Sequence, residues 1–425
     1  MAKTKAITKI KTAYGVTEYK LANGLRVLHK CDTGAPVVAV CVTFHVGSRN
    51  ESVGVTGSTH ILEHLLFKDS KNFNQANNKS TKDYLEWFGA LWNASTWLDR
   101  TNYYEMLPKE HFIEALAMEA DRLRGSLFND ADLAAEMTVV RNEFETSRNN
   151  PFELLDEEVM YKVFQSHAYR IPTIGLKEDI EGSTAAKLRK FYDTYYWPDN
   201  ATLTVFGDMP WKEVEAAIVK HFGPIPKAPH SIAQPKVKEP AQTAPRKVRI
   251  KKAMGATIAE LSYKVPEGRH ADFAAVYLLT SILAGGFAGR MQQHIVDAGL
   301  ASDISTFCAP LFDPGFANFI AQCVPNVSPE KVLEAMRQEI AAVAKESVSK
   351  EELLRAKERV LTDAANERDG VMMETRVTSE SIAAGDWTLG YKFPKDVAGL
   401  TAADIQRVAK KYFIPSKETS GILQP

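Results

Sequence analysis

The pattern of apolar and polar residues along the first half of the chain predicts both strands and helices. Residues 19–28 surround an Asn23-Gly24 turn signal and are predicted to form a hairpin. Residues 37–46 are a nearly continuous β-branched run, which is typical of a buried strand, and residues 201–206 form a second apolar strand. Helical spacing follows at about 57–68, 80–89, 109–125 and 130–148. Strands paired by hairpins and separated by helices predict an α+β fold.

A proline-rich segment near the middle of the chain interrupts this pattern. Six prolines fall between residues 224 and 245, among lysines and alanines without apolar periodicity. Because proline fixes φ and removes a hydrogen-bond donor, residues 225–247 are predicted to form an extended, semi-rigid linker. The linker separates an N-terminal domain, residues 1–224, from a C-terminal domain, residues 248–425.

The two halves show signs of internal duplication. Residues 184–198 (TAAKLRKFYDTYYWP) and 401–415 (TAADIQRVAKKYFIP) share their opening Thr-Ala-Ala, their aromatic residues and the closing proline without a gap. Each copy describes one capped helix. The match is short, and chance is the alternative explanation. Together with the equal halves it predicts two related α/β-sandwich domains, each an antiparallel-rich sheet packed with helices.

Composition and charge narrow the class of protein. The chain has 425 residues, 45% of them hydrophobic and 25% charged, with a formal net charge of −1, as in an ordinary soluble globular protein. This balance gives no electrostatic argument for a nucleic acid or an anionic membrane as partner. No apolar run is long enough for a membrane span, and no secretory signal is visible at the start.

Cysteine usage bears on the compartment. The four cysteines form no CxxC pair, which disfavours a zinc ribbon or a redox motif. They are Cys31, Cys41, Cys308 and Cys323. Such sparse cysteines predict a cytoplasmic protein, and a periplasmic location is the alternative if a signal peptide has been removed.

The chemistry of the chain centres on residues 60–64, which read HILEH. His60 and His64 are four residues apart on a predicted helix that Ser58 or Thr59 can cap, so both imidazoles project from one side. This spacing lets two neutral histidines bind one tetrahedral zinc ion. Glu63 lies beside the same metal and is better suited to act as a base on water than as a ligand. The alternative is two surface histidines with an incidental glutamate.

A catalytic zinc requires a third protein ligand and an open position for water. The best candidates are Glu136 and Glu143, which are seven residues apart and share one face of the predicted helix 130–148. Spacing alone does not choose between them. Either could instead be a solvated helix carboxylate, the commoner role of a glutamate.

Beyond this motif, the sequence resembles the pitrilysin and mitochondrial-processing-peptidase family, whose signature is the inverted zinc motif HxxEH. Several further segments are similar to family signatures, and the similarity covers nearly the whole chain. They are residues 47–51, 89–103, 167–175 and 195–203, with the closing Gly207-Asp208. The length and the duplicated halves resemble the shorter, two-domain members that pair as two-subunit clamshells.

The resemblance implies roles for individual residues. His60, His64 and Glu143 would hold one zinc ion per chain, and Glu63 would be the general base. Glu136 would be a second glutamate that orients a ligand. A further group matches the edge strand with which such enzymes pair the backbone of a peptide substrate. That group is Asn93, Ala94, Ser95 and Thr96.

The second half departs from the family pattern. Members commonly supply an arginine and a tyrosine from the second domain to stabilise the oxyanion. Here Ser302 stands where the tyrosine would be, Ile295 or Val296 stands where the arginine would be, and Arg290 matches a different, structural arginine. At the repeat offset, the second half also lacks metal ligands. The residues opposite those of the first half are Tyr277, Thr280, Ser281 and Val360.

The sequence therefore predicts a zinc-dependent endopeptidase that hydrolyses peptides or unfolded segments. Because the arginine and tyrosine are missing, we expect a heterodimer in which a paralogous subunit without HxxEH supplies that pair. A homodimer is the second choice. The main alternative function is a non-catalytic scaffold or processing-assembly subunit that retains a zinc site.

Overall fold

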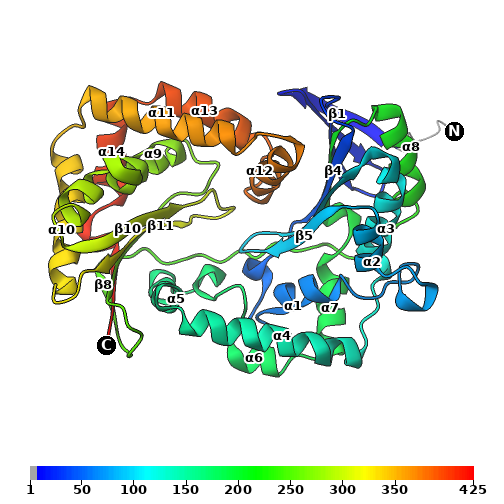
Figure 1. The fold of residues 1–425 in the computed structure, drawn as a ribbon, viewed down its shortest axis with the longest axis horizontal. Coiled ribbons are helices and arrows are strands. Elements are labelled where there is room, and N and C mark those ends of the chain that lie inside the picture. Colours follow the sequence, from blue (N-terminus) through cyan, green and yellow to red (C-terminus); the bar gives the residue numbers. More distant parts are fainter. Residues whose placement is uncertain (1–6) are drawn as a thin grey trace. The chain divides into compact units, whose positions relative to one another are not determined.

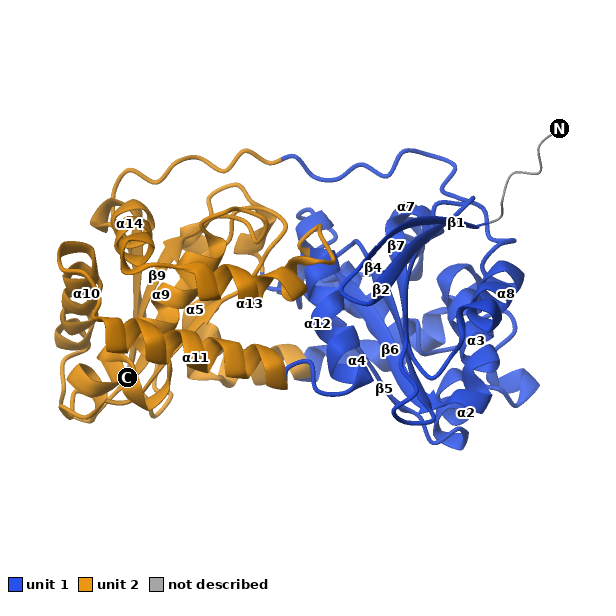
Figure 2. Ribbon diagram, turned by 90° about the horizontal axis from the view of Figure 1, so that it is seen from above, with its two compact units in different colours: residues 1–142, 172–236, 367–383 blue, residues 143–171, 237–366, 384–425 orange. Residues whose placement is uncertain are grey.

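The computed structural model describes residues 7–425 and contains two β-sheets, each packed with helices (Figure 1). The chain forms two compact units, which are coloured separately in Figure 2. Unit 1 holds the residues up to Asn142, Pro172–Lys236 and Glu367–Ala383. Unit 2 holds Glu143–Ile171, Val237–Asn366 and Ala384–Pro425.

The sheet of unit 1 has seven strands in the order β1-β2-β3-β7-β4-β6-β5. All neighbours are antiparallel except β3 and β7. The strands are β1 (Ile7–Ala13), β2 (Val16–Leu21), β3 (Arg26–Cys31), β4 (Val37–Phe44), β5 (Leu91–Thr96), β6 (Thr101–Pro108) and β7 (Ala201–Gly207). β4 and β7 are buried almost throughout, which confirms the two predicted apolar strands, and β2 and β3 form the predicted hairpin.

Eight α-helices of the described residues begin in unit 1. They are α1 (Ser58–Leu65), α2 (Thr81–Trp87), α3 (Phe112–Gly125), α4 (Asp130–Asn149), α6 (Lys177–Glu181), α7 (Ala185–Tyr195), α8 (Trp211–His221) and α12 (Val371–Ala383). α4 is continuous across the boundary between the units, which falls after Asn142. Four predicted helices, at about 57–68, 80–89, 109–125 and 130–148, correspond to α1, α2, α3 and α4.

The sheet of unit 2 has five strands in the order β10-β11-β9-β12-β8, antiparallel except for β12 and β8. Its strands are β8 (Arg246–Lys251), β9 (Ile258–Lys264), β10 (Ala301–Cys308), β11 (Phe316–Cys323) and β12 (Glu418–Gln424). The helices of the unit are α5 (Pro151–Val163), α9 (Phe273–Ala284), α10 (Pro329–Lys345), α11 (Lys350–Asn366), α13 (Leu389–Gly399) and α14 (Ala402–Tyr412). Apolar residues from α9, α10 and α14 pack on the sheet as one core.

The two sheets share one topology, in agreement with the predicted duplication. In both, a parallel pair (β3 with β7, β8 with β12) continues through three antiparallel strands (β4-β6-β5, β9-β11-β10). The repeated segments form α7 and α14, and Thr184 and Thr401 are the N-cap residues whose side chains accept from the third helical N–H. The extra hairpin strands β1 and β2 belong to unit 1 alone.

Each unit includes one helix from the other half of the sequence. α5, from the first half, packs on β12, β9 and β8 in unit 2. α12, from the second half, packs on β4 and β7 in unit 1. The units therefore interleave along the chain, whereas the predicted domains 1–224 and 248–425 follow chain order. The reason is that one face of each helix is buried against a sheet whose strands are distant in sequence. That face is apolar in α5 and mainly polar in α12.

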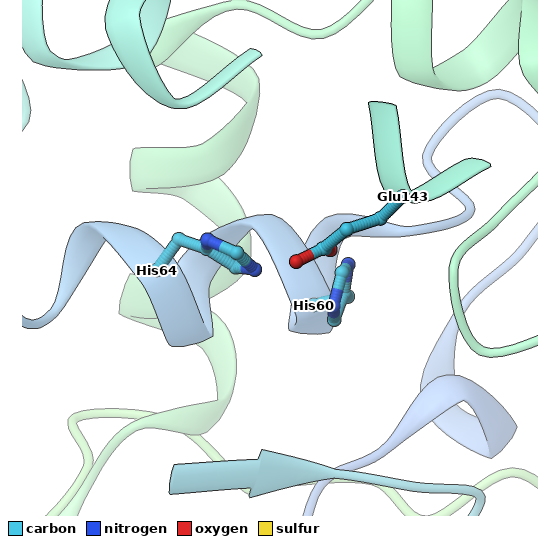
Figure 3. Close-up of side chains that lie close together, drawn as sticks. All are labelled: His60, His64 and Glu143. Carbon is cyan, nitrogen blue, oxygen red and sulfur yellow. The ribbon is translucent and has the colours of Figure 1, made fainter. Parts of the chain in front are cut away.

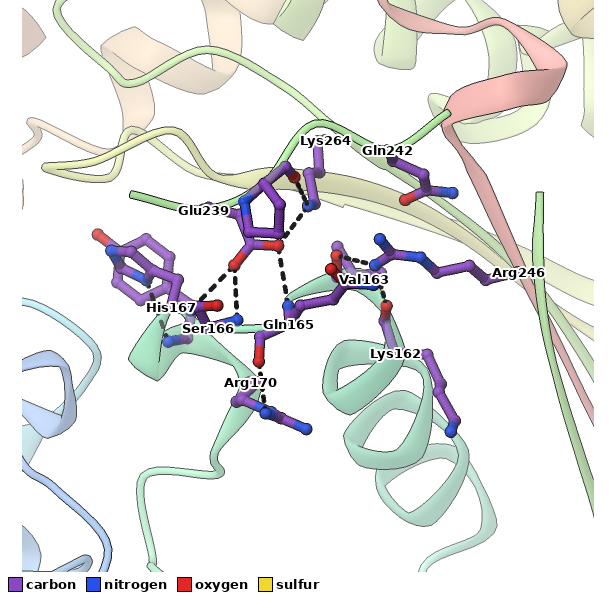
Figure 4. Close-up of polar contacts among 12 residues, drawn as sticks. Lys162, Val163, Gln165, Ser166, His167, Arg170, Glu239, Gln242, Arg246 and Lys264 are labelled. Atoms are coloured by element: carbon purple, nitrogen blue, oxygen red, sulfur yellow. Dashed lines mark hydrogen bonds and ion pairs between the residues drawn. The ribbon is translucent and has the colours of Figure 1, made fainter. Parts of the chain in front are cut away.

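The C-terminal part of the linker is fixed within unit 2 (Figure 4). The Glu239 carboxylate accepts from the backbone N–H groups of Gln165, Ser166 and His167 at 2.8, 2.8 and 2.9 Å, and from Lys264 Nζ at 2.6 Å. These bonds hold the pKa of Glu239 at about 2, although its partial burial alone would raise it. The segment after residue 236 is therefore bound to the loop that follows α5.

Two further linker residues, Gln242 and Arg246, reinforce this attachment, and the contacts of Arg246 are drawn in Figure 4. Gln242 Nε2 donates to the backbone oxygen of Glu418 at 2.7 Å, where β12 begins. Arg246 Nη1 donates to the carbonyl oxygens of Lys162 and Val163 at the end of α5. A cation at the carbonyl end of a helix is favourable.

None of the helices within residues 7–425 is both long enough and apolar enough to cross a membrane. All four cysteines are free in this part of the chain, three of them buried.

Candidate metal centre

The helix that carries HILEH is held at its start by a distant carboxylate. The N-cap position is Gly57, with φ of 81° and no side-chain cap, so the predicted capping by Ser58 or Thr59 is wrong. Instead, Glu51 Oε2 accepts from Gly57 N–H at 2.7 Å and Glu51 Oε1 accepts from Thr59 N–H at 2.7 Å. Burial raises the pKa of Glu51 to about 7, against the lowering effect of these bonds. Glu51 could not be identified from the sequence as a capping residue, because it lies six residues before Gly57 and outside the first turn of α1.

Gly57 also allows a close approach of the chain at the start of α1. A Cβ at Gly57 would lie 2.5 Å from the Ile174 backbone oxygen, and one at Gly175 would lie 2.7 Å from Gly57 N. Both glycines have positive φ, which L side chains rarely adopt. The segment 167–175 thereby fixes the start of the helix that carries the two histidines.

His60, His64 and Glu143 come together as the sequence predicts. Their candidate ligand atoms all lie within 4.8 Å of one another. The two imidazoles project from one side of α1, and Glu143 extends toward them from α4 (Figure 3). The imidazole centroids are 4.8 Å apart, with ring planes at 77°. Within residues 7–425, no other group of three His, Cys, Asp or Glu side chains is arranged in this way.

Glu136 contacts His64 from the same helix as Glu143. Glu136 Oε2 lies 3.0 Å from His64 Nδ1, and Lys68 Nζ lies 2.6 Å from Glu136 Oε1. Burial alone would raise the pKa of Glu136, but the bonds to Lys68 and His64 lower it overall. A carboxylate on Nδ1 fixes the tautomer that leaves Nε2 as the lone-pair donor. Of the two glutamates that spacing left open, Glu143 joins the cluster and Glu136 lies behind His64.

These donors fit a zinc ion. Two imidazole nitrogens and one carboxylate oxygen are a donor set typical of catalytic zinc, with a fourth position left for water or substrate. Burial lowers the pKa of His60 to about 4, and the neighbouring His64 adds to this effect. His60 is therefore neutral at pH 7, as a ligand must be.

Glu63 projects from α1 toward the end of strand β5. Burial raises the pKa of its carboxyl, while the neighbouring Thr96 and the charges of His64 and Arg100 oppose this shift. The candidate base thus contacts β5, the strand predicted to bind substrate. Lys68 and Arg100 are contacts of the site that sequence reasoning missed, since nothing in the motif points to them.

β5 is an edge strand of its sheet, so one side of its backbone lacks a neighbouring strand. Trp97 N–H donates to Arg100 O across the hairpin, and Ser95 and Asn93 lie opposite Asn102 and Tyr104. Because hydrogen-bonded pairs alternate in an antiparallel ladder, the main-chain groups of even-numbered residues face the open edge. Those residues are Trp92, Ala94 and Thr96. Accordingly, Ala94 N–H is taken by the side chain of Asn93, at 2.8 Å.

The duplicated positions in unit 2 carry no such site. Tyr277, Thr280 and Ser281 lie on α9, and Val360 lies on α11, so the repeat offset places them on the helices equivalent to α1 and α4. Thr280 and Val360 are buried, and Thr280 Oγ1 donates to the Tyr277 backbone oxygen at 2.8 Å.

Arg290 and the residues at the positions expected to bind an oxyanion make contacts within unit 2. Arg290 donates to both oxygens of Glu352, with Nη2 at 2.9 Å, which is a structural role. Ile295 is buried, and Ser302 Oγ lies 3.3 Å from the Gln322 backbone oxygen.

A two-histidine, one-glutamate cluster with a carboxylate behind one histidine, on a duplicated α/β fold, defines an inverted-motif metallopeptidase arrangement. The family model described as Insulinase (Peptidase family M16) matches residues 26–177, and the one described as Peptidase M16 inactive domain matches residues 183–360. The chain is 30% identical over 421 residues to the zinc protease PqqE of Helicobacter pylori, covering 95% of this chain and 92% of that protein. The chain belongs to the peptidase M16 family.

Solved structures give the same fold. A protease from Helicobacter pylori superposes with a TM-score of 0.91 at 27% identity, covering 99% of both chains. A structure titled peptidase M16 inactive domain, from Pseudomonas fluorescens, has a TM-score of 0.86 at 20% identity, covering 96% of this chain and 98% of that one. The predicted fold, two related α/β domains, is confirmed.

Proposed function

We propose that this chain is a zinc-dependent endopeptidase of the M16 family, with its metal on His60, His64 and Glu143. The observation that carries the proposal is the convergence of these three side chains within 4.8 Å, with Glu63 between the two histidines on the same helix. Curated relatives named zinc proteases support it at the level of the family. When bound, zinc supplies a Lewis acid that activates water near neutral pH and polarises a peptide carbonyl.

Glu63 is the proposed general base. Its carboxylate takes the proton of the attacking water and returns it to the nitrogen of the leaving amine. The helix that carries Glu63, α1, packs against strand β5. Glu136, supported by Lys68, keeps His64 in the tautomer that binds metal through Nε2.

The proposed substrate is an extended peptide that adds a strand to β5. The open edge of that strand offers the main-chain groups of Trp92, Ala94 and Thr96, in place of the continuous predicted stretch from Asn93 to Thr96. Recognition through main-chain bonds tolerates many side chains, so we expect unfolded segments to be substrates. The bond between Asn93 and Ala94 N–H has to open when a peptide binds.

The assembly is a second part of the proposal. Unit 2 offers Ser302 and buried Ile295 where an arginine and tyrosine pair is expected, and its sequence matches the inactive-domain model. We propose that a paralogous subunit supplies the pair, in a heterodimer. The cytoplasmic location stays a prediction from cysteine usage.

The decisive experiment replaces the base and keeps the ligands. Glu63→Gln has the same shape but cannot take a proton, so we expect it to keep one zinc per chain and to lose peptide hydrolysis by about 10²–10⁴-fold. Metal content is measured by atomic emission, and turnover is measured with a quenched fluorescent peptide. If the wild-type chain binds zinc yet cleaves nothing, alone or with a paralogous partner, the protein is the non-catalytic scaffold instead.

The partner is tested separately. Wild-type chain is assayed with and without a paralogue that carries the arginine and tyrosine but no HxxEH. We expect activity to rise when both are mixed and to depend on that tyrosine. Full activity of the chain by itself, unchanged by the paralogue, would refute the heterodimer and favour a homodimer or monomer.

A further inference from the structure

Arg100 connects the end of strand β5 to helix α12. It lies in the turn between β5 and β6 with 8% of its surface exposed. Nη1 donates to the backbone oxygen of Ser95 at 2.7 Å and to its Oγ at 2.9 Å. Nε and Nη2 donate to Glu380 Oε1 at 3.0 and 2.6 Å. One buried guanidinium therefore ties the end of the edge strand to helix α12.

α12 comes from the second half of the sequence but is part of unit 1. It packs on β4, β7 and β6, and Ser379 Oγ accepts from Asn102 Nδ2 on β6 at 2.9 Å. Near its other end, Glu374 accepts from Lys30 Nζ on β3 at 2.9 and 2.7 Å. The helix is thus attached to β3 through Glu374 and to β6 through Ser379, while Glu380 binds the arginine that holds Ser95 on β5.

Strand β5 also packs against the helix that carries the candidate base. Ser95, which Arg100 binds, lies on β5, and β5 is in contact with α1, the helix of Glu63. An edge strand is paired on one side only, so its end depends on such side-chain contacts for its position. A shift of β5 would move both the open main-chain groups of the strand and the surface against which α1 packs.

We propose that Arg100 and Glu380 are positioning residues that hold the end of β5 in place for peptide binding and hydrolysis. Through Glu380, helix α12 thereby helps to position the candidate site that the first half of the chain forms. This inference rests on the proposed function of β5 as the peptide-binding strand. The hydrogen bonds of Arg100 go to Ser95 and Glu380, so we expect the pair to act on substrate position and to leave metal affinity unchanged.

Glu380→Ala tests the pair, with Glu374→Ala as the matched control. Both changes remove a glutamate of α12 that accepts two bonds from a cation, and alanine suits a helix. Charged hydrogen bonds of this kind are worth about a tenfold change or more when broken. We expect Glu380→Ala to lower kcat/KM about tenfold, mainly through a higher KM, and Glu374→Ala to lower it less than about twofold.

Arg100 itself is tested at two levels. Arg100→Met removes the bonds to both Ser95 and Glu380, and we expect about a 100-fold loss of kcat/KM, because small misplacements of substrate are costly. Arg100→Lys keeps the charge but not the forked geometry, so its activity is expected between that of Arg100→Met and wild type. If Arg100→Met fails to fold, Glu380→Ala alone decides.

Direct peptide binding separates position from chemistry. In a Glu63→Gln background, a labelled unfolded peptide reports Kd by fluorescence anisotropy, and zinc content reports the metal site. We expect Glu380→Ala to weaken peptide binding about tenfold at full zinc content. Unchanged kcat/KM and Kd in Glu380→Ala, or an equal loss in Glu374→Ala, would overturn the inference. Absence of hydrolysis by the wild type with its partner would instead refute the proposed function.

Discussion

Two equivalent pairs of helices carry different side chains at matching positions. The pair in the first half is α1 with α4, and the pair in the second half is α9 with α11. α1 places His60, Glu63 and His64 beside β5, with each of them only partly buried. α9 has Tyr277, Thr280 and Ser281 at the same offsets. Thr280 is buried, and Tyr277 and Ser281 are partly buried like the two histidines, but none of the three is a histidine or a carboxylate. On the partner helices, exposed Glu143 corresponds to Val360, which is 4% exposed.

The difference shows what a metal site requires beyond a suitable fold. In the first half, His60, His64 and Glu143 come together, and Glu136 and Lys68 lie behind His64. In unit 2, the corresponding helices close on each other through apolar contacts. The fold supplies matching helix positions, and the side chains decide whether those positions bind metal or pack as core.

The largest effect is expected when Glu143 of the first half is replaced by valine, because Val360 stands at the equivalent position of the second half. Glu143→Val removes one of three ligands, so we expect zinc affinity to fall by more than the roughly 10–100-fold typical of residues behind a ligand. Hydrolysis should fall with it. Because Glu143 is exposed, the free energy of unfolding of the metal-free protein should change by less than about 1 kcal/mol. Competition with a chromophoric chelator measures affinity, and urea denaturation measures stability.

The reciprocal change, Val360→Glu, is the control. It buries an unpaired carboxylate, so we expect it to cost about 3–5 kcal/mol of stability without creating a zinc site. A second bound zinc in that variant, or a large loss of stability in Glu143→Val, would contradict the comparison.

The contact behind His64 should have an intermediate effect. Glu136→Gln keeps the size of the side chain but removes the charge that His64 Nδ1 and Lys68 meet, so zinc affinity should fall about 10–100-fold. Lys68→Met leaves the Glu136 to His64 contact in place and should cost less. Isothermal titration with zinc ranks the two variants, and equal losses would show that Lys68 matters as much as the carboxylate it supports.

The smallest effect is expected from Glu239, which binds the loop that follows α5 in unit 2. The pKa of Glu239 is about 2, below its ordinary value of 4.5, so its contribution to stability is complete above about pH 4.5 and is lost as the pH falls toward 2. Glu239→Gln should remove about 1 kcal/mol at pH 7, allowing for solvent screening, and should flatten this part of the acid profile.

Glu330 provides the matched control for that measurement. Its pKa is also about 2, through bonds from Ser328 and Arg249, but the pair with Arg249 is exposed. Glu330→Gln should therefore change the acid profile less at physiological salt. Denaturant melts between pH 2 and 7 compare the two variants, and identical profiles would argue against the role of Glu239 in unit 2.

Much of the fold could be predicted because local signals were strong. The β-branched run of β4, the Asn23-Gly24 hairpin and the threonine caps of α7 and α14 each follow from residues near in sequence. The interleaved units could not, because burial of α5 and α12 against remote sheets leaves no local pattern. The same holds for the start of α1, where Glu51 replaces the expected local cap.

The sequence by itself determined the chemistry of the candidate site: two histidines one helical turn apart, a glutamate between them, and a short choice of distal carboxylates. Spacing on a helix fixes which side chains share a face, so these relations survive without a tertiary structure. Spacing left the choice between Glu136 and Glu143 open, and the family resemblance implied Glu143. Only the tertiary structure showed that Glu143 lies within the cluster, that Glu136 lies behind His64, and that Arg100 connects β5 to α12. Such contacts join segments far apart in the chain, and their geometry is set by packing that no local pattern encodes.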